Sequence, residues 1–453
     1  MRVQLWKGWR YFTKWWPAIV VLLASNAQAF TLLGAPGLLS PGQAPNFGFD
    51  FLGEQFNPRL DIDGFVRFQT LAYRMDNANN GFLVPEVDLD LNLQLTVTQR
   101  IHALFRPLER GDLQPTEYEF GPRNPGWILR DMAVPADLYY EGQPFNWLNP
   151  NDRWPLDFTV SGGRIPLTLQ NGIWFDNIFD GFMISKNNIQ LGNLSNLNLL
   201  FFLSVGETQG GLTEAQFQQI RKKLTGVAGD ADWYAYFLEF GFACSYDNAS
   251  YQGQNFNRCF WAVSSTRTFG SAGGLSLRAM GSTGNSSMGS GELVVLETQH
   301  RLWGTLAYAN FFAATPNWLP PSVQGEALSN EGVLFTFDRL APFPQLDANG
   351  ADTIGGALGT IFQPKGIVTY TPEVGFLIDN SAFHNDQAGC ALQIQMDLAR
   401  VLLSAPGLEG VARRGLFYGA LARLTLVALR NQNTVVARDR FDFGERLELI
   451  YRF

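Results

Sequence analysis

The segment from Glu86 to Thr98 alternates apolar and polar side chains without exception over 13 residues. Successive side chains of a β-strand point to opposite faces, so this pattern predicts a strand with one apolar and one polar face. Strands of globular proteins usually have about 5–6 residues, whereas a tilted strand of about 9–11 residues crosses a bilayer. The segment therefore predicts a strand that spans a membrane.

The same alternation recurs around residues 62–68, 197–205, 234–242, 392–398 and 418–426. In hydrocarbon every backbone polar group must be paired within the protein, so such strands close into a barrel whose polar face lines the lumen. The sequence therefore predicts an all-β fold, a transmembrane antiparallel β-barrel over residues 61–453. The expected number of strands is about 16, within a range of about 14–18.

Composition excludes several other classes of protein. Charged residues make up 16% of the chain, against about 25% in an average soluble domain. The 33 Lys and Arg are outnumbered by 41 Asp and Glu, so a basic nucleic-acid-binding surface, and with it a nucleic-acid partner, is excluded. Only six of the 33 basic residues are Lys. Arg is the better residue where a cation is partly desolvated or presents a planar fork to an anion.

The first 29 residues have the organisation of a cleaved signal peptide. Basic residues precede an apolar stretch from Ala18 to Ala24, and Ala27-Gln28-Ala29 forms a small-residue cleavage site before Phe30. Residues 30–60 are rich in Gly and Pro and show no periodicity. They predict an irregular N-terminal segment, which either extends from the barrel as a tail or is tucked into it.

The last residues alternate again, with Phe441, Phe443, Leu447, Leu449, Tyr451 and Phe453 on one parity. A terminal Phe with a Tyr two residues before it resembles the assembly signal of bacterial outer-membrane β-barrel proteins. This resemblance implies location in the bacterial outer membrane, contact with outer-membrane lipid and recognition of Phe453 by the barrel-assembly machinery. Within that class the chain resembles porins. In the segment 157–181, where Gly162-Gly163-Arg164 precedes a turn with Asn and Asp, it loosely resembles alginate-export porins.

Charged residues on the polar parity are expected to line the pore. They are Arg67, Glu86, Asp88, Asp90, Arg106, Arg164, Asp397, Arg423, Arg446 and Glu448. Arg164 belongs to this set only if a β-bulge at Gly162-Gly163 turns it inward, because otherwise it would face lipid. Such charges can select solutes by size and sign, or they can merely pair across strands. The acidic net charge favours cations, whereas the excess of Arg favours anionic sugars or organic acids, so the selectivity stays open.

Residues 111–124 and 316–356 are expected to form long extracellular loops. Within 207–231, the capping pattern from Thr213 to Gln216 and the helical spacing of Phe217, Ile220 and Leu224 predict a short helix. That helix either caps the outer rim or folds into the lumen as a constriction.

Cys244 and Cys259 flank a short polar segment, and an exported chain meets an oxidising compartment. A disulfide between them is predicted, which would contribute about 3 kcal/mol in the chain-entropy model. Cys390 stays free or has another partner. The sequence has no CxxC motif for covalent haem or a classical zinc site, no GxSxG motif, and only three histidines: His102, His300 and His384. No metal, cofactor or catalytic residue is expected, so an enzyme is not predicted.

These features predict an outer-membrane porin for passive or substrate-selective passage of small polar solutes. The alternative is a barrel that serves as a sleeve or anchor for a periplasmic or surface partner, such as an electron-carrying cytochrome. Both a homotrimer and a complex with a partner protein are compatible with the sequence.

Overall fold

The computed structural model describes residues 49–51, 54–56, 58–75, 78–109, 115–120, 125–129, 135–144, 157–205, 222–247, 257–284, 289–323, 327–336, 343–381, 385–404, 419–433 and 438–453. The predicted signal peptide, most of the segment 30–60, most of the expected loop 111–124 and His384 lie outside these residues. Within 30–60, β1 (Phe49–Phe51) and β2 (Glu54–Phe56) pair as a small antiparallel sheet.

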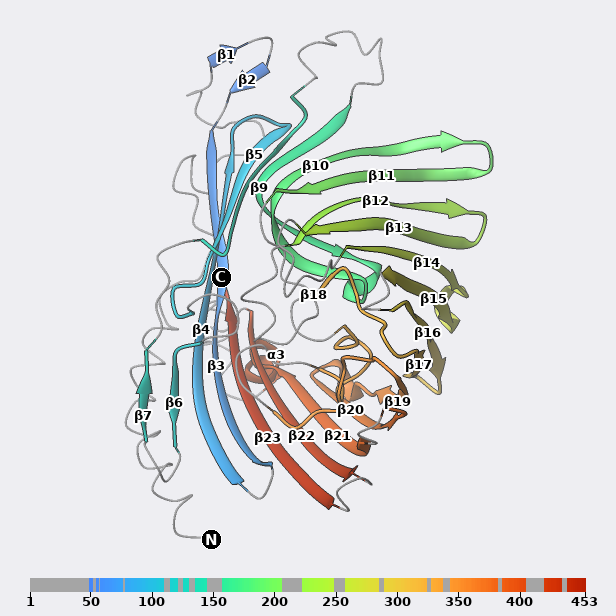
Figure 1. The fold of residues 1–453 in the computed structure, drawn as a ribbon. Coiled ribbons are helices and arrows are strands. Elements are labelled where there is room, and N and C mark those ends of the chain that lie inside the picture. The colour runs from blue at the N-terminus through green and yellow to red at the C-terminus, as the bar shows by residue number, and fades with distance from the viewer. Residues whose placement is uncertain are drawn as a thin grey trace.

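The wall of the molecule is one antiparallel sheet closed into a barrel (Figure 1). Eighteen strands form the ring: β3, β4, β5, β8–β17 and β19–β23. The ring closes where β23 pairs with β3, and there Phe453 and Gly64 exchange two backbone hydrogen bonds of 3.0 and 3.1 Å. The predicted all-β barrel is therefore confirmed, but it has 18 strands and not about 16.

The N-terminal part of the chain forms the first half of the ring. Its strands are β3 (Arg59–Met75), β4 (Ala78–Gln94), β5 (Gln99–Phe105), β8 (Asp137–Gly142), β9 (Phe158–Leu169), β10 (Phe175–Leu191), β11 (Leu194–Ser204), β12 (Lys222–Trp233) and β13 (Tyr236–Asp247). Between β5 and β8 the short strands β6 (Glu117–Glu119) and β7 (Gly126–Ile128) form a hairpin beside β4.

The second half of the ring ends at the C terminus. Its strands are β14 (Arg258–Thr268), β15 (Gly273–Gly284), β16 (Gly291–Leu302), β17 (Thr305–Ala314), β19 (Thr353–Ile361), β20 (Val368–Asp379), β21 (Asn385–Asp397), β22 (Ala420–Asn433) and β23 (Arg438–Arg452). The 3-10 turns are η2 (Gln170–Gly172), η3 (Gly270–Ala272) and η4 (Pro364–Gly366), and α3 (Leu398–Ser404) is the one α-helix of the described residues.

The extra strands occupy segments for which the sequence predicts helix or loop. β12 begins at Lys222, so Leu224 lies on a strand and not on the predicted helix, whose first residues fall outside the described part. β19 begins at Thr353, inside the expected loop 316–356. Its sequence Thr-Ile-Gly-Gly-Ala-Leu-Gly-Thr-Ile has Gly at lumen positions, and Gly gives no polar or apolar signal to an alternation pattern.

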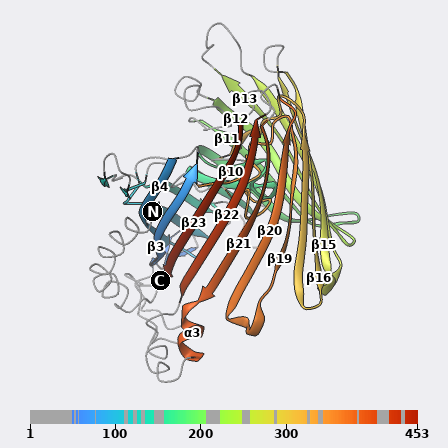
Figure 2. The same ribbon diagram turned by 90° about the horizontal axis from the view of Figure 1, so that it is seen from below.

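Six short turns lie at one end of the barrel, here called the turn end, and the two longest connections between ring strands, 106–136 and 315–352, lie at the other, the loop end. Residues 95–98, 192–193, 234–235, 269–272, 303–304 and 362–367 form the turns. The C terminus lies at the turn end, and α3 lies at the same end as the turn between β19 and β20 (Figure 2). In outer-membrane barrels the end with short turns faces the periplasm.

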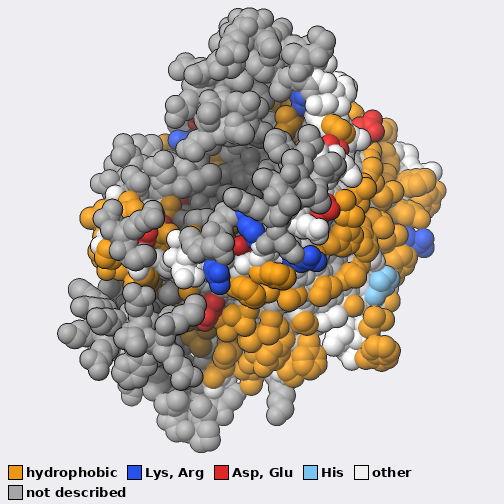
Figure 3. All heavy atoms as spheres, turned by 60° about the horizontal axis from the view of Figure 1, so that its bottom comes forward, with side chains coloured by type: hydrophobic (Ala, Val, Ile, Leu, Met, Phe, Trp, Pro, Cys, Tyr) orange, Lys and Arg blue, Asp and Glu red, His pale blue; other side chains and the backbone are white. Residues whose placement is uncertain are grey.

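The outer face of the barrel carries an apolar belt (Figure 3). Its exposed members include Phe182, Ile184, Val227, Phe242, Val263, Leu277, Val294, Leu358, Val374, Phe443 and Leu447. Residues of the opposite parity, such as Glu86, Arg278 and Glu448, are buried inside. An apolar outer face on a closed sheet is the form in which strands span a membrane. Among the described residues, no helix is both long enough and apolar enough to span a membrane.

Two segments fold from the loop end into the lumen. The inward hairpin comprises residues 165–180, because β8 pairs with β9 only as far as Arg164, and β11 pairs with β10 only as far as Gly181. The inward loop comprises the described residues between 315 and 352. The two segments meet where β18 (Ser322–Val323) pairs with Phe175 and Asp176 in parallel.

Apolar side chains hold both segments against the inner wall. Trp174 and Phe175 of the inward hairpin are fully buried, as are Leu334 and Leu346 of the inward loop. A side chain at Gly375 of β20 would meet Leu334 and Leu346 at 3.0 Å, so the bare glycine makes room for the loop. The expected extracellular loop 316–356 therefore turns inward, because its large apolar side chains are removed from water inside the barrel.

Candidate functional site

Charged residues of β22, β23, β3, β4 and β5 form a connected group on one side of the lumen. Glu448 of β23 lies 3.1 Å from Arg67, 3.4 Å from Arg423 and 3.7 Å from Arg446. Arg67 is also paired with Glu86 of β4. The antiparallel register brings these residues together, since Arg67 is directly opposite Glu86 and Arg423 directly opposite Glu448.

The same group continues to Arg106, directly after β5, which pairs with Asp88 at 3.3 Å. Glu86, Asp88 and Glu109 are buried, and one carboxylate oxygen of each lies within 4.8 Å of the others. Within the described residues this is the one group of three acids close enough to share a metal ion. The guanidinium groups of Arg67 and Arg106 already pair with two of the three carboxylates, so the charge that a cation would neutralise is partly neutralised.

In this group the arginines lie closer to water than the acids. The side chains of Arg67 and Arg423 are 18% and 28% exposed, whereas those of Glu86 and Glu448 are 3% and 1% exposed. Arg446 is an exception, because it is buried and its guanidinium lies 5.0 Å from the centre of the Phe343 ring. A solute in the lumen therefore meets guanidinium groups with their carboxylates behind them. We call the group the arginine-front network.

The opposite part of the ring has a second charged cluster. Arg278 of β15 donates to Glu297 of β16 at 2.6 Å and to Glu239 of β13 at 2.7 Å. Here the order of exposure is reversed, since Arg278 is 9% exposed and the side chains of Glu239 and Glu297 are 21% and 19% exposed. We call this group the acid-front cluster.

The tip of the inward hairpin covers Arg278. Arg278 donates to the side-chain oxygen of Gln170 at 3.2 Å, and Asn171 donates to Glu297 at 3.2 Å. Gln170 and Asn171 both have positive φ angles, of 53° and 57°, at the tight turn that carries them. The hairpin therefore contacts the acid-front cluster directly and contributes neutral amide groups to the lumen beside it.

Glu373 of β20 fastens the inward loop to the wall. Its carboxylate accepts hydrogen bonds from the backbone N–H groups of Val333 and Leu334, at 2.8 and 2.7 Å, and from the hydroxyl of Tyr308 on β17. Glu373 is itself buried. Because a buried carboxylate is stabilised by such donors, its position and that of the loop backbone depend on each other.

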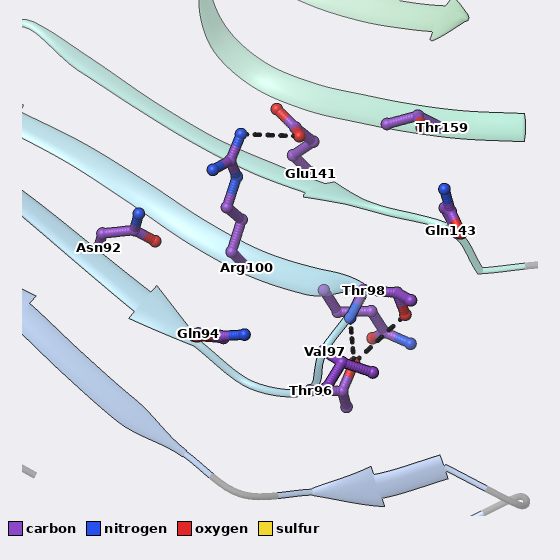
Figure 4. Close-up of a pocket in the computed structure, with 10 residues that line it drawn as sticks. Asn92, Gln94, Thr96, Val97, Thr98, Arg100, Glu141, Gln143 and Thr159 are labelled. Carbon is purple, nitrogen blue, oxygen red and sulfur yellow. Dashed lines mark hydrogen bonds and ion pairs between the residues drawn. The ribbon is translucent and has the colours of Figure 1, made fainter. Parts of the chain in front are cut away.

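Polar residues continue along β4, β5 and β8 toward the turn end. His102 lies 2.7 Å from Asp90 and 3.0 Å from Asp137. Further along, Arg100 pairs with Glu141 at 2.8 Å beside a recess of about 380 Å³. Figure 4 shows that amide and hydroxyl side chains line this recess, among them Asn92, Gln94, Thr98, Gln143 and Thr159. The recess therefore adds uncharged polar groups at the turn end, beyond the charged part of the lumen.

Seven of the ten predicted pore-lining residues belong to the arginine-front network: Arg67, Glu86, Asp88, Arg106, Arg423, Arg446 and Glu448. Asp90 lies beside them in the His102 cluster. Asp397 lies instead at the turn end, where it accepts from the backbone N–H of Arg400 at 3.1 Å at the start of α3. Asp397 therefore accepts a hydrogen bond at the N-terminal end of α3 and lies away from the arginine-front network.

Arg164 differs from its predicted arrangement. The pairing of β9 with β8 and with β10 is continuous, so the bulge expected at Gly162-Gly163 is absent. Arg164 therefore has the parity opposite to that of buried Ser161 and Ile165, and it is paired in register with Asp180. Gly163 has a φ of +128°, and this residue immediately precedes the point where the inward hairpin leaves the wall. A glycine bend, not a bulge, marks this position, because only Gly adopts this backbone angle without strain.

Sequence reasoning missed Arg278, Glu239, Glu297 and Glu373. For two of them the sequence does contain an alternation signal. Glu239 lies between the apolar residues Leu238 and Phe240, and Arg278 follows Leu277 on the polar parity. The predicted disulfide between Cys244 and Cys259 is confirmed, and Cys390 is free and exposed on β21. The disulfide joins β13 to β14 at the loop end, on the wall and not in the charged part of the lumen.

Solved structures that resemble this architecture include porins of Pseudomonas. The OccK2 (OpdF) structure from Pseudomonas aeruginosa has a TM-score of 0.56 at 12% identity and covers 87% of this chain and 97% of that chain. OccK2 in complex with glucuronate has a TM-score of 0.56 at 11% identity, covering 87% and 98%. A BenF-like porin from Pseudomonas fluorescens Pf-5 has a TM-score of 0.53 at 10% identity, covering 87% and 98%.

No protein-family model and no curated protein matches the sequence. At identities of 10–12% the likeness to the solved structures rests on the fold. The closed barrel, its apolar belt and these neighbours agree on one conclusion. The chain has the fold of an outer-membrane porin.

Proposed function

We propose that this protein is an outer-membrane channel for small hydrophilic solutes, with a preference for anionic ones. The observation that carries the proposal is the order of exposure in the arginine-front network. Arg67 and Arg423 reach the lumen, while Glu86 and Glu448 lie buried behind them. The first charged groups that a solute touches there are guanidinium groups.

The buried carboxylates fix the guanidinium groups without shielding them from the lumen. A guanidinium presents several N–H donors in a planar fork, and a carboxylate on a solute can accept two of them at once. Rings or rows of Arg favour anions in pores in this way. Each Arg is already paired when no solute is present. Binding a solute therefore costs little conformational entropy, because the guanidinium groups are ordered beforehand.

The proposed solutes are small carboxylates, such as acidic sugars or organic acids. One structural neighbour, OccK2, has been solved in complex with glucuronate, a sugar that carries a carboxylate. The same class fits a path that begins with guanidinium groups and continues past the amide and hydroxyl groups of the turn-end recess. In this proposal the guanidinium groups bind the carboxylate of the solute, and the amide and hydroxyl groups of the recess bind its hydroxyl groups.

The test is the reversal potential of single channels of the full chain in a planar bilayer across a salt gradient. We expect discrete open steps and a reversal potential of the sign given by anion preference. Arg423→Gln should reduce that preference, because it removes the most exposed guanidinium of the three around Glu448. Arg430→Gln is the matched control, since Arg430 is on the same strand, exposed and on the outward parity.

A cation preference that Arg423→Gln leaves unchanged would contradict the anionic preference while keeping the channel. A barrel that inserts without conducting would contradict the channel itself and support the alternative of a sleeve for a partner protein. The sleeve has less support, because the inward hairpin and inward loop of the chain itself already occupy part of the lumen.

A further inference from the structure

Glu331 is a buried acid that the proposed solute path does not use. It lies in the inward loop and is 0% exposed, and neither carboxylate oxygen has a hydrogen-bond partner among the described residues. Its backbone, in contrast, is held on both sides. The N–H donates to Leu328 at 3.0 Å, and the carbonyl accepts from the Asn310 side chain at 2.8 Å. The carboxyl group is therefore kept in place by its backbone and not by partners of its own.

The charged groups around Glu331 do not compensate an ionised carboxylate. Glu297 of β16 repels it, and Arg278 of β15 attracts it. However, the guanidinium of Arg278 already donates to Glu239, Glu297 and Gln170. On the side of β20 the next residue of the loop, Gly332, faces the carboxylate of Glu373, which is itself bonded to Tyr308 of β17. An ionised Glu331 would thus be a buried charge in a region that already contains an excess of acids.

Under these conditions the neutral acid is the stable form of the buried side chain. Burial, together with repulsion from Glu297 that Arg278 only partly offsets, raises the pKa of Glu331 to about 8. The neighbouring residue ties this position to the inward hairpin, since Asn330 donates to the backbone carbonyl of Asn171 at 2.8 Å. A movement of Glu331 therefore affects both inward segments and the cover over Arg278.

We propose that Glu331 is a proton-operated latch, whose neutral carboxyl group keeps the inward loop seated against the barrel wall and the inward hairpin. When the carboxyl group loses its proton, it moves toward water and the loop loosens. No covalent step is involved, because the proton is exchanged with solvent.

The direction of the pH dependence follows from the raised pKa. A carboxyl group that binds its proton more tightly when buried stabilises the seated loop fully below the ordinary pKa of about 4.5. That stabilisation is lost progressively as the pH rises to about 8, where the buried group itself ionises. Within this window each pH unit changes the seating equilibrium by up to about tenfold. The loop is seated at acidic pH and loosened at alkaline pH.

The experiment measures single-channel conductance of the full chain in a planar bilayer between about pH 5 and about pH 9. The native channel should show larger or more variable open steps as the pH rises. Glu331→Gln, which keeps the shape of the neutral acid, should remove this change and resemble the native channel at low pH. Glu292→Gln is the control, because Glu292 is an exposed acid on β16 and its variant should keep the native pH profile.

The first readout depends on conduction through the proposed channel. A second readout tests the latch without it. Amide hydrogen exchange of Val333 and Leu334, corrected for the intrinsic pH dependence of exchange, reports whether their bonds to Glu373 are intact. We expect protection at low pH, loss of protection near pH 8 in the native chain, and retained protection in Glu331→Gln. A barrel that carries no current but shows these exchange results would contradict the channel and support the latch.

Two results would overturn the proposal. One is a Glu331→Gln variant whose exchange and conductance keep the native pH dependence. The other is loosening by a chelator at constant pH with reversal by Ca²⁺, since that result would make Glu331 part of a cation site and not a proton latch.

Discussion

The arginine-front network and the acid-front cluster contain the same kinds of ion pair but present opposite charges to the lumen. In the first, Arg67 and Arg423 are more exposed than Glu86 and Glu448, and in the second Glu239 and Glu297 are more exposed than Arg278. The two groups lie on opposite sides of the ring. The charge that a solute encounters is thus set by which partner of each pair lies deeper and not by the sum of charges.

The difference has a structural cause in the inward hairpin. Gln170 covers Arg278, which leaves the flanking acids more open to water. In the arginine-front network the register places acids and arginines directly opposite each other on neighbouring strands. Phe343 of the inward loop covers Arg446 there. In the acid-front cluster an inward segment therefore covers the cation, whereas in the arginine-front network the register of the strands pairs each arginine with its acid.

The largest expected effect is on stability. Arg67→Ala should lower the free energy of unfolding by about 3–5 kcal/mol, because it leaves the buried acids Glu86 and Glu448 without this partner. Arg278→Ala should cost less, about 1–2 kcal/mol, because water reaches Glu239 and Glu297. Denaturant unfolding in lipid vesicles measures both. Equal losses would show that the difference in exposure has no energetic consequence.

The next effect concerns the inward loop between the two groups. Glu373→Ala removes the acceptor of the Val333 and Leu334 N–H groups, and we expect the loop to lose about 1–3 kcal/mol of stabilisation. Single-channel conductance should rise as the loop moves. Glu373→Gln is the matched variant, because its amide oxygen can still accept a hydrogen bond. If the alanine variant conducted like the native channel, the loop would not narrow the pore.

A smaller effect, of less than tenfold in permeability ratio or under about 1.4 kcal/mol, is expected on selectivity. Arg423→Gln should move the reversal potential toward cations, and Glu239→Gln should move it toward anions. The opposite signs follow from the two orders of exposure. Shifts of the same sign in both variants would mean that one of the two groups does not face the permeating ions.

The smallest effect is expected at Phe343. Its ring lies 5.0 Å from the guanidinium of Arg446, and Phe343→Leu keeps an apolar side chain there while removing the cation–π contact. The loss should be about 0.5–1 kcal/mol in unfolding free energy, with little change in selectivity because Arg446 is buried. A change in reversal potential as large as that of Arg423→Gln would show that Arg446 also reaches the lumen.

Much of the wall of the barrel can be predicted from the sequence, because each strand carries its own periodicity. The alternation from Glu86 to Thr98 assigns Glu86 and Asp88 to the polar face, and the structure places both inside. The pairing of Cys244 with Cys259 follows equally from local sequence. The strand count is less predictable, since the Gly-rich strand β19 has no alternation to detect.

The sequence by itself determined the class of fold, the polar and apolar faces of the regular strands and most members of the arginine-front network. Only the tertiary structure decided that residues 165–180 and the loop after β17 fold inward, and that Arg278 meets Glu239 and Glu297. It also decided that the carboxyl group of Glu331 is buried with no hydrogen-bond partner among the described residues. The physical reason is that alternation is a property of one strand, whereas register, lumen filling and depth of burial depend on contacts between strands far apart in the chain.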